Sequence, residues 1–375
     1  MAAAHPHTCH QLLADWVAIQ EATQLRVCHQ RGHAATTSWR LWTFFCHNLG
    51  VDVFCLPSDP IPLLQVFAQR LRAGTLCASR RRVSSRTVED TVCGVAQTYA
   101  SMGAPDPHMN VHGALDFRLT SLYQAWSNLD APPSRVKPLP LSLVTHVVTL
   151  AHQEDTPAAR AAADCLVLGF IFMLRPGEYL GFPNDTLDTL FRLSDVILWI
   201  GARALDLFTC PIADLQDATF VTLTFTRQKN GVRNETIGHG RSHHPTLCSV
   251  LCLVSRVLAL QRLQAPASAP INAYGTSPAS PLCFVQPADL TRRMRLALAM
   301  FPNPAFAMSD VSARSTRAGG AMALLCAGVD NNRIRLIGRW RSDEHFRYLH
   351  MQAQPVMTGI SAAMFRGGSF RLASG

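Results

Sequence analysis

The sequence contains no apolar run long enough to span a membrane, because its longest one, from Cys165 to Leu174, stops at Arg175. A membrane helix needs about 20 such residues. No basic stretch followed by an apolar stretch occurs at the N-terminus, so we predict no secretory signal. Charged residues are also scarce, at 16% against 48% hydrophobic residues, which excludes a disordered chain. We expect a soluble intracellular protein, nuclear if its source is eukaryotic.

The cysteines lack the spacing of a metal site or of a disulfide scaffold. Twelve of them are scattered between Cys9 and Cys326, without any CxxC pair. Disulfide frameworks are typical of short secreted chains, and Cys-His pairs such as Cys46-His47 do not have the spacing of structural zinc sites. We expect free thiols, no metal and no cofactor.

Lysine is nearly absent, because only Lys137 and Lys229 occur among 34 basic residues. The net charge of +9 favours a polyanionic partner. The arginine content can reflect GC-rich coding, yet it makes the position of each lysine informative. Lys229 lies at a predicted turn, and an ammonium can release a proton where a guanidinium cannot. Lys229 is therefore a candidate for proton transfer, with a role in solubility as the alternative.

A proline-rich segment divides the chain. Residues 131–140 contain four prolines, which cannot continue a helix and favour an extended linker. Before it, apolar periodicity predicts helices at residues 12–24, 37–50, 62–71, 84–101 and 116–128, with Thr37-Ser38 as the cap of the second. We predict a helical domain over residues 1–130, a second domain over 141–350 and a tail over 351–375.

The second half has mixed patterns. Helices are predicted at 158–174, 247–263 and 290–299, with three short ones between 312 and 350. Strands are predicted at 193–200, 219–226 and 232–237, and Asn230-Gly231 between the last two favours a hairpin. Residues 265–281 are predicted to form a surface loop. The whole chain is therefore expected to be mostly α with a small antiparallel β-sheet, an α+β fold.

Basic residues cluster at two places that could meet phosphate. Four arginines lie beside serines in residues 79–86, at a predicted helix start, where charge, hydroxyls and N–H groups can bind phosphate together. A solvated basic turn is an equally good interpretation. In the second half, Arg175 follows an apolar helix with Glu178 near enough to orient it, although a helix-terminal charge is the common role of such a residue.

The last candidate residues lie between 312 and 350. Arg314 and Arg317 are three apart, hence on one face of a helix, and Gly319-Gly320 lets another backbone approach behind them. Fixed guanidiniums can neutralise a pentacoordinate phosphate, and a phenol such as Tyr348 can act as a nucleophile. For Tyr348 alone, a partly buried aromatic on an amphipathic helix is the alternative.

In this order the residues resemble the catalytic domain of the tyrosine recombinases, the phage-integrase-like family. The family order is Arg, Lys, His-x-x-Arg, His or Trp, and Tyr. Here it reads Arg175, Lys229, Arg314-x-x-Arg317, Arg339 and Tyr348. The segments RPGE, QKNG, STRAGG and GRWRSDEHFRY are most similar to the Crypton and DIRS-type transposon branch. The resemblance covers residues 140–350, and more loosely the first half, which resembles the family's core-binding domain.

The resemblance implies an enzyme that closes as a C-shaped clamp on double-stranded DNA and integrates or excises a mobile element. Tyr348 would attack the scissile phosphate, leaving a 3′-phosphotyrosine, and Lys229 would protonate the 5′-oxygen. Arg175, Arg314 and Arg317 would hold the non-bridging oxygens, with Arg339 as a further donor. The resemblance further implies a tail that docks on a neighbouring subunit, and hence a tetramer on two DNA sites. Candidate residues for other DNA contacts are Arg40, Arg80, Arg81, Arg82, Arg86 and Lys137.

Two positions depart from the family. Its histidine is Arg314 here, and its His or Trp is Arg339, with Trp340 beside it. Because arginine cannot serve as a general base, we hypothesise that His345, one helical turn before Tyr348, accepts the proton. A catalytically inactive DNA-binding protein derived from such a recombinase is the alternative function, and a monomeric relaxing activity like that of type IB topoisomerases is a third.

Overall fold

The chain divides into two compact units, Met1–Pro133 and Ser134–Gly375, and each is described by itself. The computed structural model describes residues 29–54, 56–77, 80–131, 137–183, 189–226, 228, 233–301, 306–342 and 346, with four more between 11 and 18. The division falls inside the predicted linker at 131–140. Most of the predicted helix at 12–24 and the whole tail at 351–375 lie outside the described residues.

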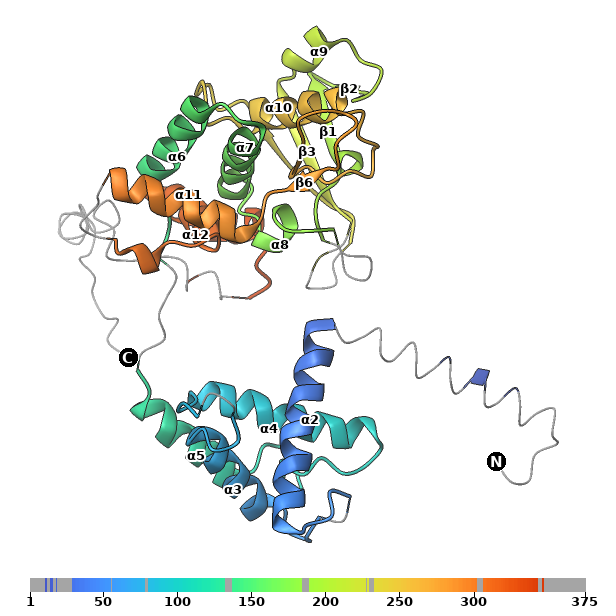
Figure 1. Ribbon diagram of the computed structural model, residues 1–375, viewed down its shortest axis with the longest axis vertical. Coiled ribbons are helices and arrows are strands. Elements are labelled where there is room, and N and C mark those ends of the chain that lie inside the picture. Colours follow the sequence, from blue (N-terminus) through green and yellow to red (C-terminus); the bar gives the residue numbers. More distant parts are fainter. Residues whose placement is uncertain are drawn as a thin grey trace, which may run out of the picture. The chain divides into compact units, whose positions relative to one another are not determined.

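The described part of the first unit contains four helices, shown in Figure 1. They are α2 (His29–Leu49), α3 (Ile61–Arg72), α4 (Ser85–Ser101) and α5 (Phe117–Leu129). Prolines start α3, while the Ser84 and Asp116 side chains accept backbone N–H groups at the starts of α4 and α5. The predictions for these three helices are confirmed.

The cap predicted at Thr37-Ser38 is wrong, because α2 begins at His29 and Ser38 lies inside it. Ser38 is buried, and a Cβ placed on Gly94 of α4 would lie 2.8 Å from its hydroxyl. The two small residues therefore let α2 and α4 pack closely. Trp42, Phe45 and Phe67 meet in the core of this unit.

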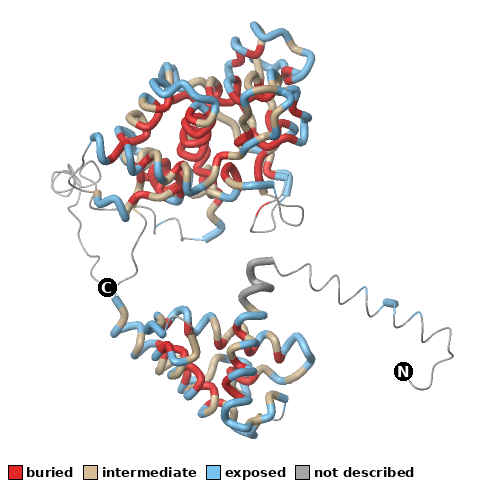
Figure 2. Tube along the Cα trace, viewed as in Figure 1, coloured by how far each residue is buried: buried red, intermediate tan, exposed pale blue. Residues whose placement is uncertain are grey.

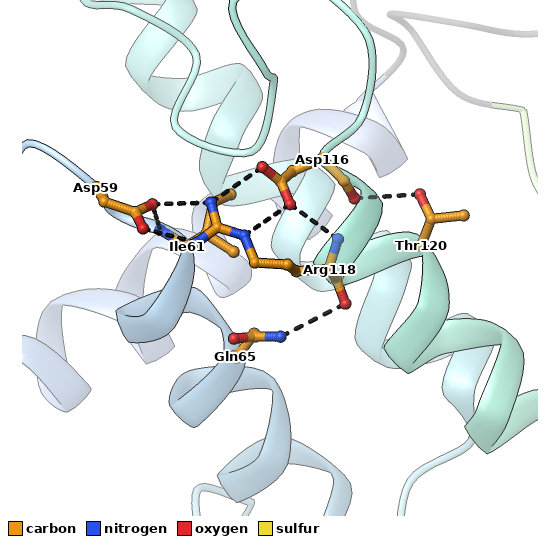
Figure 3. A network of polar contacts seen from close by, with 6 residues as sticks. All are labelled: Asp59, Ile61, Gln65, Asp116, Arg118 and Thr120. Atoms are coloured by element: carbon orange, nitrogen blue, oxygen red, sulfur yellow. Dashed lines mark hydrogen bonds and ion pairs between the residues drawn. The ribbon is translucent and has the colours of Figure 1, made fainter.

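A polar network joins the starts of α3 and α5 (Figure 3). The Arg118 guanidinium donates to Asp59 at 2.6 and 3.0 Å and to Asp116 at 3.0 and 3.1 Å. Hydrogen bonds from Arg118 lower the pKa of both carboxyl groups. The network is exposed, so it fixes geometry more than it adds stability.

The second unit is built around α7 (Pro157–Ile171), in which every residue from Ala161 to Phe170 is buried (Figure 2). Helices α6 (Leu141–Glu154), α10 (Ser249–Arg262), α11 (Pro287–Met300) and α12 (Ser315–Cys326) pack around it (Figure 1). Alanines along α7 keep it thin enough to be surrounded. The shorter helices are α8 (Pro176–Tyr179), α9 (Ile212–Gln216) and α13 (Asn331–Ile337), with 3₁₀ turns at Leu193–Asp195 and Met308–Asp310.

An antiparallel sheet completes the second unit. Its order is β2 (Arg203–Leu205), β1 (Val196–Ile200), β3 (Phe220–Phe225) and β4 (Glu235–Gly240). The expectation of three strands is wrong, because the short edge strand β2 pairs Leu205 with Leu198 after a turn at Gly201. Residues 265–281, predicted as a loop, contribute β5 (Ala273–Tyr274), which pairs with β6 (Cys283–Phe284). The mostly α fold with a small antiparallel sheet is confirmed.

Glycines and one left-handed residue shape the centre of this unit. A Cβ on Gly320 would lie 2.2 Å from the Phe170 carbonyl oxygen, so α12 approaches the backbone of α7 as Gly319-Gly320 predicted. The predicted helix to Leu174 ends earlier, at Ile171, because Met173 is left-handed and Arg175 is extended before Pro176. Pro176 therefore starts α8 and does not stop α7.

No described helix is long and apolar enough to cross a membrane.

Candidate active site

Glu178 lies at the centre of the candidate site. Pro176 starts the one-turn helix α8, and Glu178 folds back so that its Oε2 accepts the Arg175 backbone N–H at 2.7 Å. The Arg175 Nη1 donates to Oε1 of the same carboxylate at 3.0 Å. The Glu178 side chain is 3% exposed and that of Arg175 is 30% exposed. One buried carboxylate thus holds both the backbone and the guanidinium of Arg175.

Arg339 approaches Glu178 from the other side. It follows α13 in the left-handed region, with φ of 57°, and its side chain points into the unit. Its Nη2 lies 3.1 Å from Glu178 Oε2 and 3.3 Å from the Met173 carbonyl oxygen, and its guanidinium carbon is 3.7 Å from the centroid of the Phe225 ring. Burial lowers the pKa of Arg339. The terminal nitrogens of this guanidinium are therefore occupied by protein groups.

Arg317 is held by the two residues that flank Arg339. It lies in the first turn of α12, is 4% exposed, and donates from Nη2 to the Gly338 carbonyl oxygen at 2.5 Å. Its guanidinium carbon lies 4.5 Å from the centroid of the Trp340 ring. A Cβ on Gly338 would overlap that ring, at 1.6 Å, so a larger residue there would displace the ring from Arg317.

Arg314 has different surroundings from Arg317. It occupies the N-cap position of α12 and is exposed. It lines an open groove of about 860 Å³, together with Arg292 and Arg295 of α11 and Pro176 of α8. Three arginines therefore line this groove. Pro176, which also lines it, directly follows Arg175 in the sequence.

Three predicted site residues, Lys229, His345 and Tyr348, lie outside the described residues. Lys229 lies between β3 and β4 in the sequence, and the ring of Phe225, the last residue of β3, packs on Arg339. Gln228 is buried and donates to Glu235 Oε2 at 2.7 Å. Phe225, Gln228 and Glu235 were missed from the sequence, since nothing in the alternating pattern marks which end of a hairpin meets an arginine.

The other predicted DNA-contacting residues are mostly exposed. Arg40 lies on α2, and the four arginines between residues 80 and 86 precede or start α4. The Ser84 hydroxyl accepts the Thr87 N–H, so it serves as a helix cap. Lys137 forms an ion pair with Asp310 at 2.8 Å, within the second unit.

Arg292 and Arg295 were also missed. They lie three residues apart on the exposed face of α11, inside the helix predicted at 290–299, so their spacing was the available signal.

Among the described residues, no group of three or more His, Cys, Asp or Glu side chains could hold a metal ion.

No protein family model and no curated protein matches this chain. Solved structures with a similar chain path include the Tn1549 transposon integrase in complex with transposon right end DNA, at 12% identity and a TM-score of 0.47 over 93% of this chain and 98% of that one. The XerH site-specific recombinase bound to its palindromic difH substrate is 10% identical, with a TM-score of 0.49 over 82% of this chain and 72% of that one. The XerA recombinase is 13% identical, with a TM-score of 0.36 over 94% and 97%.

Proposed function

We propose that this protein is a site-specific DNA recombinase of the tyrosine type, which cuts and rejoins DNA through a covalent phosphotyrosine. One observation carries the proposal. Arg175, Arg317 and Arg339 come from three separate segments. Arg175 and Arg339 both donate to Glu178, and Arg317 donates to the carbonyl of Gly338, the residue before Arg339. A cluster of fixed guanidiniums is suited to a phosphate whose negative charge grows in the transition state.

In the proposed reaction the Tyr348 phenol gives its proton to His345, and the Tyr348 oxygen attacks the scissile phosphorus. The bond from phosphorus to the 5′-oxygen breaks, Lys229 gives that oxygen a proton, and the 3′ end stays on Tyr348 as a phosphodiester. Attack by a 5′-hydroxyl reverses these steps on the same or another strand. The free energy of the original bond is retained, so the reaction needs neither ATP nor a metal.

The arginine-lined groove along α11 is a suitable place for the DNA backbone to bind. Arg292, Arg295 and Arg314 line it, and it borders Pro176, next to Arg175. Arginines spaced along an open groove neutralise phosphates and fix the register of a duplex. We propose that phosphates adjoining the scissile one lie in this groove, and that the arginines at 80–86 add contacts from the first unit.

The finer assignments rest on sequence resemblance. We propose that the enzyme belongs to the Crypton and DIRS-type branch, moves a mobile element, and works as a tetramer on two DNA sites. A tail over 351–375 that docks on a neighbouring subunit would link the subunits, and a eukaryotic source would place the enzyme in the nucleus.

A catalytically inactive DNA-binding protein is the second candidate, favoured by Arg314 in place of the family histidine. An arginine can hold a phosphate oxygen but cannot accept the Tyr348 proton. Such a protein would bind the same DNA through its arginines without cutting it.

A nicked suicide duplex that carries the element's own termini tests the proposal. The parent protein should form a covalent protein–DNA adduct on a denaturing gel, and Tyr348→Phe should form none while binding the duplex equally well. Binding without an adduct in the parent would favour the inactive DNA-binding protein. An adduct that persists in Tyr348→Phe would exclude Tyr348 as the nucleophile.

A further inference from the structure

The tripeptide Gly338-Arg339-Trp340 contacts Arg317 directly, and it contacts Glu178, the carboxylate that holds Arg175. The Gly338 carbonyl and the Trp340 ring hold Arg317, while the Arg339 side chain holds the carboxylate of Glu178, which holds Arg175. A single turn of chain therefore controls two guanidiniums that come from elsewhere in the fold.

Arg339 is poorly placed to touch a substrate phosphate. Its side chain is 1% exposed, and it lies between the Glu178 carboxylate and the face of the Phe225 ring. Both of its terminal nitrogens point at protein acceptors, Glu178 and the Met173 carbonyl. Arg175, in contrast, is 30% exposed beside the same carboxylate.

The charges around Glu178 give Arg339 a different role. Glu178 carries one negative charge and contacts two arginines, so the Arg339 charge offsets it and leaves the Arg175 charge for a substrate. Without Arg339, Arg175 and Glu178 would form a neutral pair in a poorly solvated site, where such a pair is strongly held. Glu235 acts on Arg339 as a second acidic neighbour, and its carboxylate is already bonded to Gln228.

We propose that Arg339 is a positioning residue that neutralises Glu178 and thereby keeps Arg175 available to the scissile phosphate. This inference rests on the proposed function. It assigns Arg339 an indirect role, where the sequence suggested a direct phosphate contact. It also explains why an arginine is suited to this position, since neither a neutral histidine nor a tryptophan could offset a buried carboxylate.

A second-site rescue tests the proposal. Arg339→Met keeps an apolar side chain and removes the charge that lies over Phe225. It should slow adduct formation about a hundredfold, the effect of losing Arg175 as a transition-state donor. Adding Glu178→Gln should then restore at least tenfold, because Arg175 is released from the neutral pair. Arg333→Met is the matched control, since Arg333 is exposed on α13 and its removal should leave the rate unchanged.

Three results would overturn the proposal. Arg339→Met could cleave as fast as the parent, Arg333→Met could be as slow as Arg339→Met, or the double variant could be no faster than Arg339→Met. The last result is expected if Arg339 touches the phosphate directly. Equal urea midpoints for the single and double variants would show that the rescue is not a recovery of folding.

A binding measurement separates this inference from the proposed function. In the Tyr348→Phe background, the affinity ratio between a normal duplex and one with a neutral methylphosphonate at the scissile position reports the charge that faces the phosphate. The ratio should fall with Arg339→Met and recover with Glu178→Gln, even if the parent never forms an adduct. A ratio that does not respond to Arg339→Met would refute the positioning role alone.

Discussion

Glu178 Oε2 lies 3.1 Å from Arg339 Nη2, although the two residues are 161 positions apart in the sequence. Their side chains are 3% and 1% exposed, so little solvent screens the pair. The contact joins the RPGE segment, which begins α8, to the GRW turn after α13. It thereby links two of the predicted phosphate-binding motifs inside the second unit.

The close approach of α12 to α7 predicts a steric effect at Gly320. The Cβ of Gly320→Ala would lie 2.2 Å from the Phe170 carbonyl oxygen, and that backbone atom cannot rotate away. We expect the free energy of unfolding in urea to fall by about 1–3 kcal/mol. Gly240→Ala is the control, because its nearest neighbour would be an ordinary 3.8 Å contact. Equal urea midpoints for the two variants would show that α12 can shift without loss.

The lysine in an arginine-rich chain predicts a proton-transfer defect. Lys229→Arg keeps the positive charge but replaces the ammonium with a guanidinium, which does not release a proton. Adduct formation should therefore slow by about 10²–10⁴-fold while DNA affinity is unchanged. A duplex whose scissile 5′-oxygen is replaced by sulfur should restore the rate, since a thiolate leaves without a proton. If Lys229→Arg is equally slow on both duplexes, Lys229 does not act as the acid.

The groove along α11 predicts a salt effect. Arg292→Gln and Arg295→Gln should each weaken DNA binding. Each should also make the negative slope of log affinity against log salt less steep by about 1. Arg203→Gln is the control, because Arg203 is exposed on β2 and pairs with Asp214. A slope equal to that of the parent in both groove variants would place the DNA elsewhere.

A buried carboxyl group predicts the pH dependence of stability. Asp164 lies on α7, accepts a hydrogen bond from Ser255 at 3.0 Å, and burial raises its pKa to about 6. The unfolded chain releases this proton near pH 4, so the folded state binds more protons between pH 4 and 6. The contribution of Asp164 to stability is therefore greatest at low pH and declines as pH rises to about 6, by about 3 kcal/mol at most.

Urea unfolding of Asp164→Asn and the parent between pH 4 and 7 measures this dependence. The parent should lose stability relative to Asp164→Asn between about pH 4 and pH 6 and level off between pH 6 and pH 7. Asp90→Asn, at an exposed position on α4, should run parallel to the parent. Parallel curves for Asp164→Asn and the parent would show that this carboxyl ionises normally.

Local signals in the sequence were sufficient for most helices and for the fold class. Prolines before α3, Ser84 before α4 and Asp116 before α5 mark where those helices begin, because each acts on the backbone next to it. The start of α2 and the strand β2 escaped prediction for the opposite reason. Ser38 is suited to helix packing against Gly94, and β2 exists because β1 offers it an edge.

The order of the candidate site residues was likewise determined by the sequence alone, since Arg175, Lys229, Arg317, Arg339 and Tyr348 can be aligned without coordinates. Only the tertiary structure decided which guanidinium faces solvent. Arg314 and Arg339 look alike in sequence, yet Arg314 lines an open groove and Arg339 is enclosed by Glu178 and Phe225. The charge that an arginine presents to a ligand depends on neighbours contributed by distant segments, and packing sets those neighbours.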